Sequence, residues 1–199
     1  LFATAAAVST HAAGNLVNTY VDYVRGDDDA SSSDLTIVSG SMKPARVLSL
    51  AVAAYGVAAG ATAALCTTSP APTPLLLAMS TAGATSAFAY TAGPGLKRRA
   101  LGDVLIAATF GPLLVGFGYA AQAGSLGGGA LLASLPFALH AAAILHANNV
   151  RDCEADRAAG VRTLAGALGT AASTRLYELL VLAPFVAAGW RAATVSALD

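Results

Sequence analysis

Long stretches without a charged side chain limit most strongly what this sequence can fold into. No Asp, Glu, Lys or Arg occurs in 1–21, 47–96, 104–150 or 179–190. Only 11% of the residues are charged and 56% are hydrophobic, whereas soluble domains average about 25% charged residues. A surface so poor in charge favours lipid as its solvent, so we expect an integral membrane protein that lies in a lipid bilayer.

The lengths of these stretches predict an all-α fold, a polytopic bundle of transmembrane helices. A helix needs about 20 apolar residues to cross the roughly 30 Å hydrocarbon core of a bilayer, so each of the two longest stretches would hold a pair of helices. Segments rich in Pro or Gly at 67–74 and 123–129 provide the turns within these pairs. The predicted spans are 1–23, 46–66, 74–92, 103–121, 129–151 and 174–195.

The basic residues are unevenly distributed between the two sides of this predicted bundle. If the spans alternate in direction, three loops share one side: 24–45, 93–102 and 152–173. These loops and the adjoining helix ends hold every Lys and Arg except Arg191. The positive-inside rule assigns this side to the cytoplasm. For Arg98, Arg99 and Arg175 such a role in topology is a sufficient explanation, but it does not explain why acidic residues gather on the same side.

A first polar cluster lies at the end of the first predicted span. Asn15, Asn18 and Asp22 are spaced i, i+3 and i+7, so they share one face of a helix. A polar stripe at the membrane edge can serve solvation alone, but buried polar groups in membrane spans are costly and usually functional. The acidic run 27–29 follows directly. One of its Asp residues is a candidate ligand, and the others suit a solvated loop.

A second polar cluster follows the fifth predicted span. Asn148, Asp152 and Asp156 are spaced i, i+4 and i+8, which stacks three side chains on one face of a helix over about two turns. Asn149 and Arg151 lie beside them and are further candidates for binding an anionic substrate. We expect the two clusters, although distant in the sequence, to meet at one membrane rim.

The residue types in these clusters favour magnesium and diphosphate. Carboxylate and amide oxygens suit Mg²⁺, which prefers octahedral oxygen coordination and binds phosphate oxygens of substrates. The metal would neutralise charge that builds on a leaving group, and nearby Arg and Lys would bind the remaining phosphate oxygens. A diphosphate with an apolar tail fits a site that is polar at the rim and apolar below. The implied reaction is loss of pyrophosphate from an allylic diphosphate and capture of the carbocation by an acceptor.

Two other classes of protein compete with this interpretation. A transporter coupled to cations or protons would place carboxylates at several depths in the membrane, whereas the predicted spans have none near their centres. A structural protein with polar helix ends leaves the repeated Asn-x-x-x-Asp pattern unexplained. The net charge of zero argues against nucleic acid as a partner.

Other polar residues have simpler explanations. His140 and His146 lie in an apolar span, where a histidine is most often a hydrogen-bonded core residue. Tyr90 suits an aromatic belt at the membrane surface as well as a binding site. Asp103 suits the N-terminus of the fourth span, and the proline in segment 109–112 predicts a kink within it.

These segments resemble the UbiA superfamily of intramembrane aromatic prenyltransferases, most closely the branch that makes menaquinone (vitamin K2) and phylloquinone. The resemblance extends over nearly the whole chain, and its two Asp motifs are specific when taken together. The residues that carry it are GNLVNTYVDY at 14–23 with Gly26 and Asp28, YTAG at 90–93 with Lys97, ALGD at 100–103, TFGP at 109–112, ILHANNVRD at 144–152 and DRAAG at 156–160.

The resemblance implies a fold of nine transmembrane helices with a Mg²⁺-bound polyprenyl diphosphate between the two motifs. This chain would be a single domain over 1–199, truncated at both ends and holding about six of those helices. The implied metal ligands are Asn18, Asp22, Asp28, Asn148, Asp152 and Asp156, among which Asp22, Asp152 and Asp156 are the catalytic set. The implied diphosphate-binding residues are Asn18, Tyr90, Lys97, Asn148, Asn149 and Arg151.

One position departs from the general pattern of the family. The last Asp of the first motif would fall at Gly26 in most members, whereas the quinone branch shifts it to the position of Asp28. Asp27 and Asp29 are the alternatives for this ligand. The expected function is transfer of a polyprenyl group, such as geranylgeranyl, to a naphthoquinone-type acceptor. The alternatives are a homogentisate, 4-hydroxybenzoate or porphyrin acceptor, or the transporter above.

Overall fold

Stretches rich in Ala and Leu form the long helices, because both residues are among the strongest helix formers. The computed structural model describes residues 1–30 and 32–196. Its long helices are α1 (Phe2–Arg25), α2 (Pro44–Thr68), α3 (Thr73–Thr91), α7 (Leu135–Arg151) and α10 (Thr170–Ser196). The shorter ones are η1 (Leu96–Arg98), α4 (Gly102–Ala108), η2 (Thr109–Leu113), α5 (Leu114–Ala123), α6 (Gly128–Ala133), α8 (Cys153–Ala158) and α9 (Leu164–Leu168). The described residues form no β-strand, and the predicted all-α class is confirmed.

Composition marks several of these segments as membrane spans. Within the described residues, four are long and apolar enough to cross a bilayer: Pro44–Thr68, Gly102–Ala123, Gly128–Arg151 and Thr170–Ala188. They match four of the six predicted spans and indicate a multi-pass membrane protein. The other two predicted spans correspond to α1 and α3, which have 24 and 19 residues. These helices are long enough to span but less apolar, because α1 carries the polar stripe and α3 several Ser and Thr residues.

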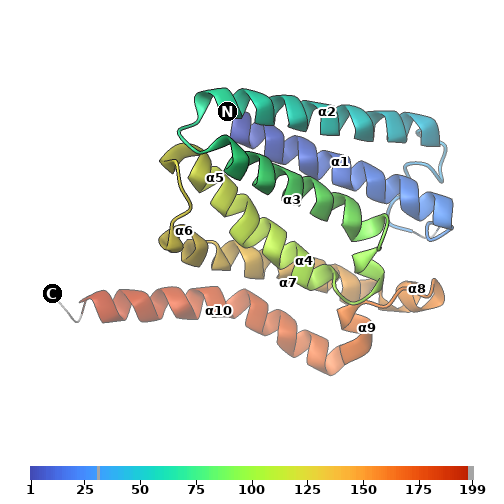
Figure 1. Cartoon of the computed structure of the whole chain (residues 1–199). Coiled ribbons are helices and arrows are strands. Elements are labelled where there is room, and N and C mark those ends of the chain that lie inside the picture. The colour runs from blue at the N-terminus through green and yellow to red at the C-terminus, as the bar shows by residue number, and fades with distance from the viewer. Residues whose placement is uncertain (31, 197–199) are drawn as a thin grey trace.

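Successive long segments alternate in direction (Figure 1). As a result, the connections that follow α1 and α3 lie at the same end of the bundle as α8 and α9, on the right-hand side of Figure 1. The turns that follow α2 and α5 lie at the opposite end. The predicted gathering of the charged loops at one end is therefore confirmed.

Small residues let the helices approach closely. Gly14 of α1 faces Ala87 of α3, and a Cβ atom on Gly14 would lie 3.0 Å from the Ala87 Cβ. Gly111 of η2 is closer still to α7, since a Cβ there would lie 2.4 Å from the Ala138 Cβ. In lipid the hydrophobic effect does not drive helices together, so close van der Waals contact at glycine and alanine stabilises such crossings instead.

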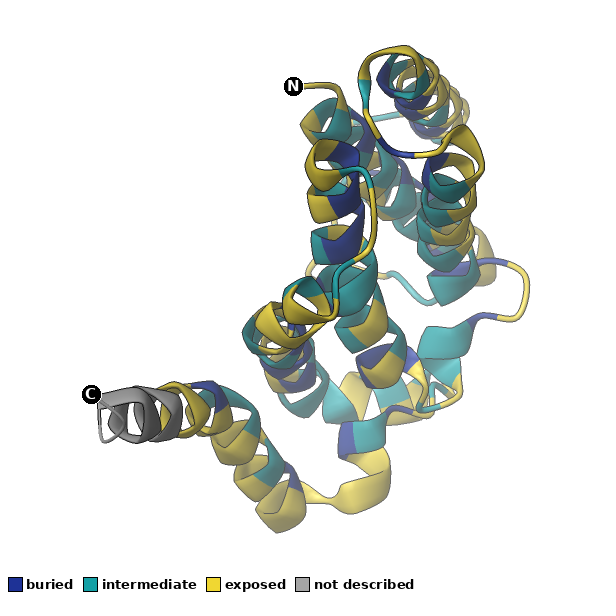
Figure 2. Cartoon of the chain, turned by 60° about the vertical axis from the view of Figure 1, so that its left-hand side comes forward, coloured by how far each residue is buried: buried dark blue, intermediate teal, exposed yellow. Residues whose placement is uncertain are grey.

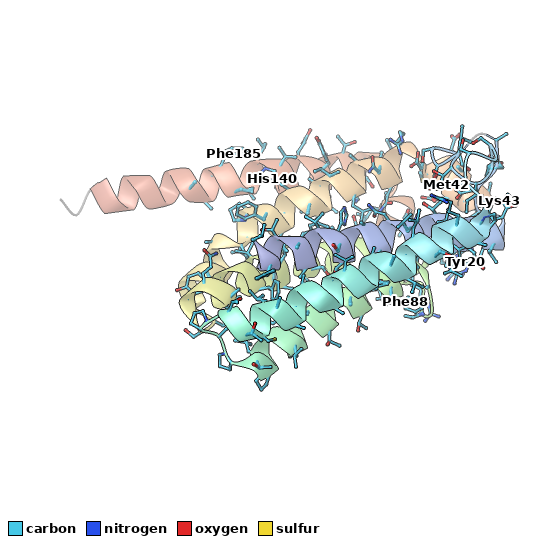
Figure 3. All side chains as sticks on the ribbon, turned by 90° about the horizontal axis from the view of Figure 1, so that it is seen from above. Tyr20, Met42, Lys43, Phe88, His140 and Phe185 are labelled. Atoms are coloured by element: carbon cyan, nitrogen blue, oxygen red, sulfur yellow. The ribbon has the colours of Figure 1, made fainter. Side chains whose placement is uncertain are left out.

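The outer faces of the helices are exposed, while buried residues face neighbouring helices (Figure 2). Large apolar side chains are part of this outer surface: Phe185 and Val186 of α10 are 65% and 70% exposed. So much exposed apolar surface requires lipid or further protein to cover it. His140 of α7 points toward Phe185 of α10 (Figure 3), with ring centroids 5.7 Å apart. Its Nδ1 lies 2.8 Å from the Pro136 carbonyl oxygen, so its interpretation as a hydrogen-bonded packing residue is confirmed.

Two of the predicted spans are interrupted. The predicted kink near Pro112 is present as a π-helical turn, η2, between α4 and α5. The span predicted at 129–151 is present as the apolar segment Gly128–Arg151, in which the single residue Ser134 separates α6 from α7. Pro136 explains this break, since proline has no backbone N–H to donate to the preceding turn.

Candidate active site

A large cavity opens at the end of the bundle where the charged loops gather. Its volume is about 1080 Å³, and it lies between α1, α3, α4, α7 and α8. Residues of both polar clusters line it, so the structure brings together what the sequence separates. All the residues predicted for the site are in its wall: Asn18, Asp22, Asp28, Tyr90, Lys97, Asn148, Asn149, Arg151, Asp152 and Asp156.

Lys97 connects the first cluster to the turn that follows α3. Its Nζ donates to Asp22 Oδ2 at 2.5 Å and to Asn18 Oδ1 at 3.1 Å. Thr91 Oγ1 also donates to Asn18 Oδ1, at 2.5 Å. Asp22 is only 6% exposed, and its second oxygen, Oδ1, is buried without a hydrogen-bond partner among the described residues. This unpartnered anionic oxygen is suited to a cation.

The turn between α3 and α4 places Lys97 over the end of α1. Gly95 has a φ of 58°, a left-handed conformation that glycine adopts without strain. A Cβ on this residue would also lie 3.2 Å from the Thr91 carbonyl oxygen. Arg25 Nη1 donates to that same carbonyl oxygen at 2.8 Å. The C-terminal ends of α1 and α3 are thereby fixed side by side, with Lys97 above them.

The acidic run after α1 divides between two roles. Gly26 ends the helix with a φ of 74°, and Asp27 then forms an ion pair with Arg98. Asp28 is half-buried in the wall of the cavity. Burial, together with the nearby charges of Asp22 and Asp34, raises the pKa of Asp28 to about 6. The neighbouring carboxylates that raise this pKa are the kind of environment that a cation stabilises, so Asp28 is the better candidate for a metal ligand.

Asp34 anchors the loop that carries these carboxylates. Thr19 Oγ1 of α1 donates to Asp34 Oδ2 at 2.6 Å, and the Thr36 N–H donates to Oδ1 at 2.9 Å. Burial acts to raise the pKa of Asp34, but these hydrogen bonds outweigh it and lower the pKa below its ordinary value. Asp34 lines the cavity as well, although no spacing pattern in the sequence marks it as a site residue.

The second cluster is not on one uninterrupted helix, so that part of the prediction is wrong. α7 ends at Arg151, and Asp152 has a φ of −93° and a ψ of 7° before α8 begins. The backbone still joins the three residues, since the Asp152 N–H donates to Asn148 O and the Asp156 N–H to Asp152 O, both at 2.9 Å. These bonds keep the three side chains at one wall of the cavity despite the break.

The two clusters act on each other electrostatically. Burial raises the pKa of Asp156, and the charge of Asp152 raises it further, while Lys97 opposes the shift. Asp22, on the other side of the cavity, contributes to the same increase. Arg151 donates from Nε and Nη2 to the two oxygens of Asp152, each at 2.7 Å. Acidic residues of both motifs therefore share one electrostatic environment that a multivalent cation would stabilise.

A buried network behind the cavity went unnoticed in the sequence. His146 Nδ1 lies 3.0 Å from Asp103 Oδ1, and Asn149 Nδ2 donates to Asp103 Oδ2 at 3.4 Å. His146 is fully buried and Asp103 is 6% exposed. Asp103 lies in the first turn of α4, as predicted, but it also holds α7 against α4 and orients Asn149. The ALGD segment and a histidine close to Asn148 were the only signals in the sequence.

Away from the loops most of the residues that line the cavity are apolar. Its wall there includes Ala87, Phe110, Ile144 and Leu145. His11 lies in the same region and packs edge-on against Phe110, with ring centroids 5.4 Å apart. No pattern in the sequence marks His11 as a site residue. A polar mouth above an apolar interior suits a ligand with an anionic head and a hydrocarbon tail.

The carboxylate and amide oxygens in the wall are of the kind that Mg²⁺ binds, although they do not surround one common point. In the described part of the chain, no three His, Cys, Asp or Glu side chains are close enough together to hold a metal. Lys97, Arg98 and Arg151 instead pair with Asp22, Asp27 and Asp152. The free Oδ1 of Asp22 and the facing carboxylates and amides match the oxygen ligands that Mg²⁺ prefers.

Comparisons with known proteins identify the family to which this chain belongs. The model of the UbiA prenyltransferase family matches residues 1–198. The chain is 42% identical over 181 residues to UbiA prenyltransferase domain-containing protein 1 of Homo sapiens, an alignment that covers 91% of this chain and 54% of that protein. The UbiA prenyltransferase domain-containing protein 1 homolog of Drosophila melanogaster is 41% identical over 178 residues, which cover 89% of this chain and 50% of that protein. The chain thus spans about half the length of these relatives. Because the family match extends over almost every residue, the chain belongs to the UbiA prenyltransferase family.

Proposed function

We propose that this chain carries the diphosphate site of a Mg²⁺-dependent enzyme that transfers a polyprenyl group to a naphthoquinone-type acceptor. The observation that carries the proposal is that residues of both Asp motifs line one and the same cavity, with the unpartnered Asp22 Oδ1 in its wall. The change from a polar mouth to an apolar interior supports a diphosphate head and a polyprenyl tail. The position of Asp28, six residues after Asp22, supports the quinone branch of the family.

Different residues of the cavity would bind the metal and the diphosphate in such a reaction. Asn18, Asp22, Asp28, Asn148, Asp152 and Asp156 would hold Mg²⁺, which supplies positive charge against the diphosphate and the departing pyrophosphate. Lys97 and Arg151 would exchange their carboxylate partners for phosphate oxygens. Asn149, which Asp103 orients, would donate to the diphosphate through its amide.

The chemical step is a substitution at the allylic carbon. The bond between that carbon and the diphosphate oxygen breaks, and its electron pair leaves with pyrophosphate. A ring carbon of the acceptor, in its electron-rich reduced (hydroquinone) form, then forms the new carbon–carbon bond and loses its proton to pyrophosphate or water. The apolar part of the cavity keeps water from the allylic cation, and the aromatic ring of Tyr90 in the wall is suited to stabilise it.

The location of the acidic residues favours this function over a cation-coupled transporter. A relay through the membrane would need carboxylates at several depths. Among the described residues, the acidic side chains that line the cavity all belong to the connection after α1 or to the helix ends nearby. We further propose that this end faces the cytoplasm, as the distribution of Lys and Arg predicts, and that the chain is part of a single domain.

Incubation of the whole protein with labelled geranylgeranyl diphosphate and a panel of aromatic acceptors, with and without Mg²⁺, tests the proposed function. We expect a prenylated naphthoquinone-type product that forms only with Mg²⁺. Preferred prenylation of homogentisate, 4-hydroxybenzoate or a porphyrin would contradict the proposed acceptor. Equal turnover after removal of all divalent cations would contradict the metal site.

A further inference from the structure

A second hollow beside the candidate active site is lined by several arginines. This arginine pocket has a volume of about 630 Å³ and lies between the turn that contains η1 and the segment that contains α8 and α9. Its charged side chains are Arg98, Arg99, Arg157 and Arg162, and no Asp or Glu of the described residues lines it. Four guanidinium groups around one hollow create a strongly positive potential there.

Backbone hydrogen bonds hold the two basic segments together. The Ala100 N–H donates to the Arg162 carbonyl oxygen at 2.7 Å, and the Arg162 N–H donates to the Arg98 carbonyl oxygen at 3.3 Å. Like charges repel, so the backbone must impose this convergence against the electrostatic preference of the side chains. A role in membrane topology requires basic residues on this side, but it does not require them to line a common pocket.

Three of the four arginines are available to a ligand. Arg98 is occupied, because it pairs with Asp27 and donates from Nη2 to the Ala159 carbonyl oxygen at 3.1 Å. The side chains of Arg99, Arg157 and Arg162 form neither an ion pair nor a hydrogen bond with any residue that the structure describes. All three residues are also exposed, so an anion from solution can reach them.

The arginine pocket adjoins the larger cavity. Val161 and Thr163 line both hollows. The two partners of Arg98, Asp27 and Ala159, lie in the wall of the larger cavity, so the Arg98–Asp27 ion pair stands between them. An anion that leaves the candidate active site therefore meets these free arginines next to it.

We propose that the arginine pocket is a phosphate-binding site that works without Mg²⁺. Guanidinium groups bind phosphate oxygens through paired, charge-assisted hydrogen bonds. The phosphate has two available sources, pyrophosphate released from the larger cavity and the headgroup of an anionic lipid at the membrane surface. The first source rests on the proposed prenyl transfer, whereas phosphate binding by the pocket does not.

Direct binding of pyrophosphate in the absence of divalent cations tests the free-anion source. The whole protein in phosphatidylcholine nanodiscs is titrated with radiolabelled pyrophosphate in EDTA, because the acidic cavity repels this anion when no metal is present. We expect at least about tenfold weaker binding in Arg157→Gln/Arg162→Gln, since this variant loses the charge-assisted hydrogen bonds of two guanidinium groups. Arg175→Gln removes a cation on the same side but outside the pocket, and it should bind as the wild type does.

A second measurement tests the lipid source. Native mass spectrometry counts the phosphatidylglycerol molecules retained by the wild type, Arg157→Gln/Arg162→Gln and Arg175→Gln. Loss of pyrophosphate binding in the pocket variant alone supports the free anion, and loss of retained phosphatidylglycerol alone supports the lipid headgroup. If the pocket variant matches Arg175→Gln in both measurements, the proposal is wrong.

A further variant separates this proposal from the proposed function. Asp22→Asn lies in the larger cavity and should weaken Mg²⁺-dependent binding of a prenyl diphosphate, but it leaves the arginine pocket intact and should not weaken pyrophosphate binding in EDTA. If the wild-type protein binds pyrophosphate in this pocket but catalyses no prenyl transfer, the phosphate site is upheld and the proposed function is wrong.

Discussion

The ion pair between Lys97 and Asp22 allows a quantitative prediction about stability. The side chains of Lys97 and Asp22 are only 18% and 8% exposed. Lys97→Met removes the ammonium group but keeps much of the apolar stem, so Asp22 stays buried without its cation. Removal of one partner of a buried pair costs about 3–5 kcal/mol. Because Lys97 retains some exposure, we expect a loss of about 3 kcal/mol, which corresponds to an apparent melting temperature about 6–12 °C lower.

Magnesium should reverse most of this loss if Asp22 is a metal ligand. A ligand at about 100 times its dissociation constant stabilises the folded state by about 2.7 kcal/mol. The gain should be larger in Lys97→Met than in the wild type, because the wild-type ammonium competes with the metal for the same carboxylate. Thermal unfolding in nanodiscs, followed by intrinsic fluorescence in EDTA and in Mg²⁺, measures both effects.

A matched control separates the ion pair from the loss of a lysine in general. Lys43 is exposed just before α2, so Lys43→Met should change the melting temperature little and show no added response to Mg²⁺. If Lys97→Met and Lys43→Met have the same melting temperature in EDTA, the reasoning about the buried ion pair is wrong. A destabilised Lys97→Met that Mg²⁺ does not rescue would refute the metal site.

Three more predictions concern pH, packing and topology. Because Asp28 has a raised pKa of about 6, protons should compete with Mg²⁺ for it below that pH. The apparent Mg²⁺ affinity should then fall by up to about tenfold per pH unit. If Mg²⁺ titrations show the same pH dependence for Asp28→Asn as for the wild type, this prediction is wrong. Gly111→Ala places a Cβ 2.4 Å from that of Ala138 and should cost about 1–3 kcal/mol of stability, whereas Gly60→Ala, which has nothing within 4 Å, should cost none. A membrane-impermeant thiol reagent on the cytoplasmic side should label Cys153 but not Cys66, and the reverse pattern would overturn the orientation.

Features of the site that depend on local periodicity were accessible from the sequence. The spacing of Asn18 and Asp22 places both on one helical face, and the structure has them in the wall of one cavity. The alternation of spans brings Asp152 and Asp156 to the same end as Asp22, because each span reverses the direction of the chain. These inferences needed only the helical repeat and the thickness of a bilayer.

Features that depend on tertiary contacts were not accessible in this way. His146 and Asp103 are separated by 43 positions, and their contact depends on how α7 packs against α4. The ion pairs of Lys97 with Asp22 and of Arg98 with Asp27 bridge more than 70 positions. The break at Asp152 likewise has no proline or glycine to announce it, so the spacing alone predicted a continuous helix.

The binding of a non-cleavable prenyl diphosphate tests most directly whether the two Asp motifs bind one substrate together. The affinity of geranylgeranyl thiodiphosphate is measured in Mg²⁺ for Asp22→Asn, Asp152→Asn and the control Glu154→Gln, whose exposed side chain lies outside the cavity wall. We predict at least about tenfold weaker binding in each motif variant and wild-type affinity in the control. Wild-type affinity in either Asp22→Asn or Asp152→Asn would contradict a shared metal–diphosphate site.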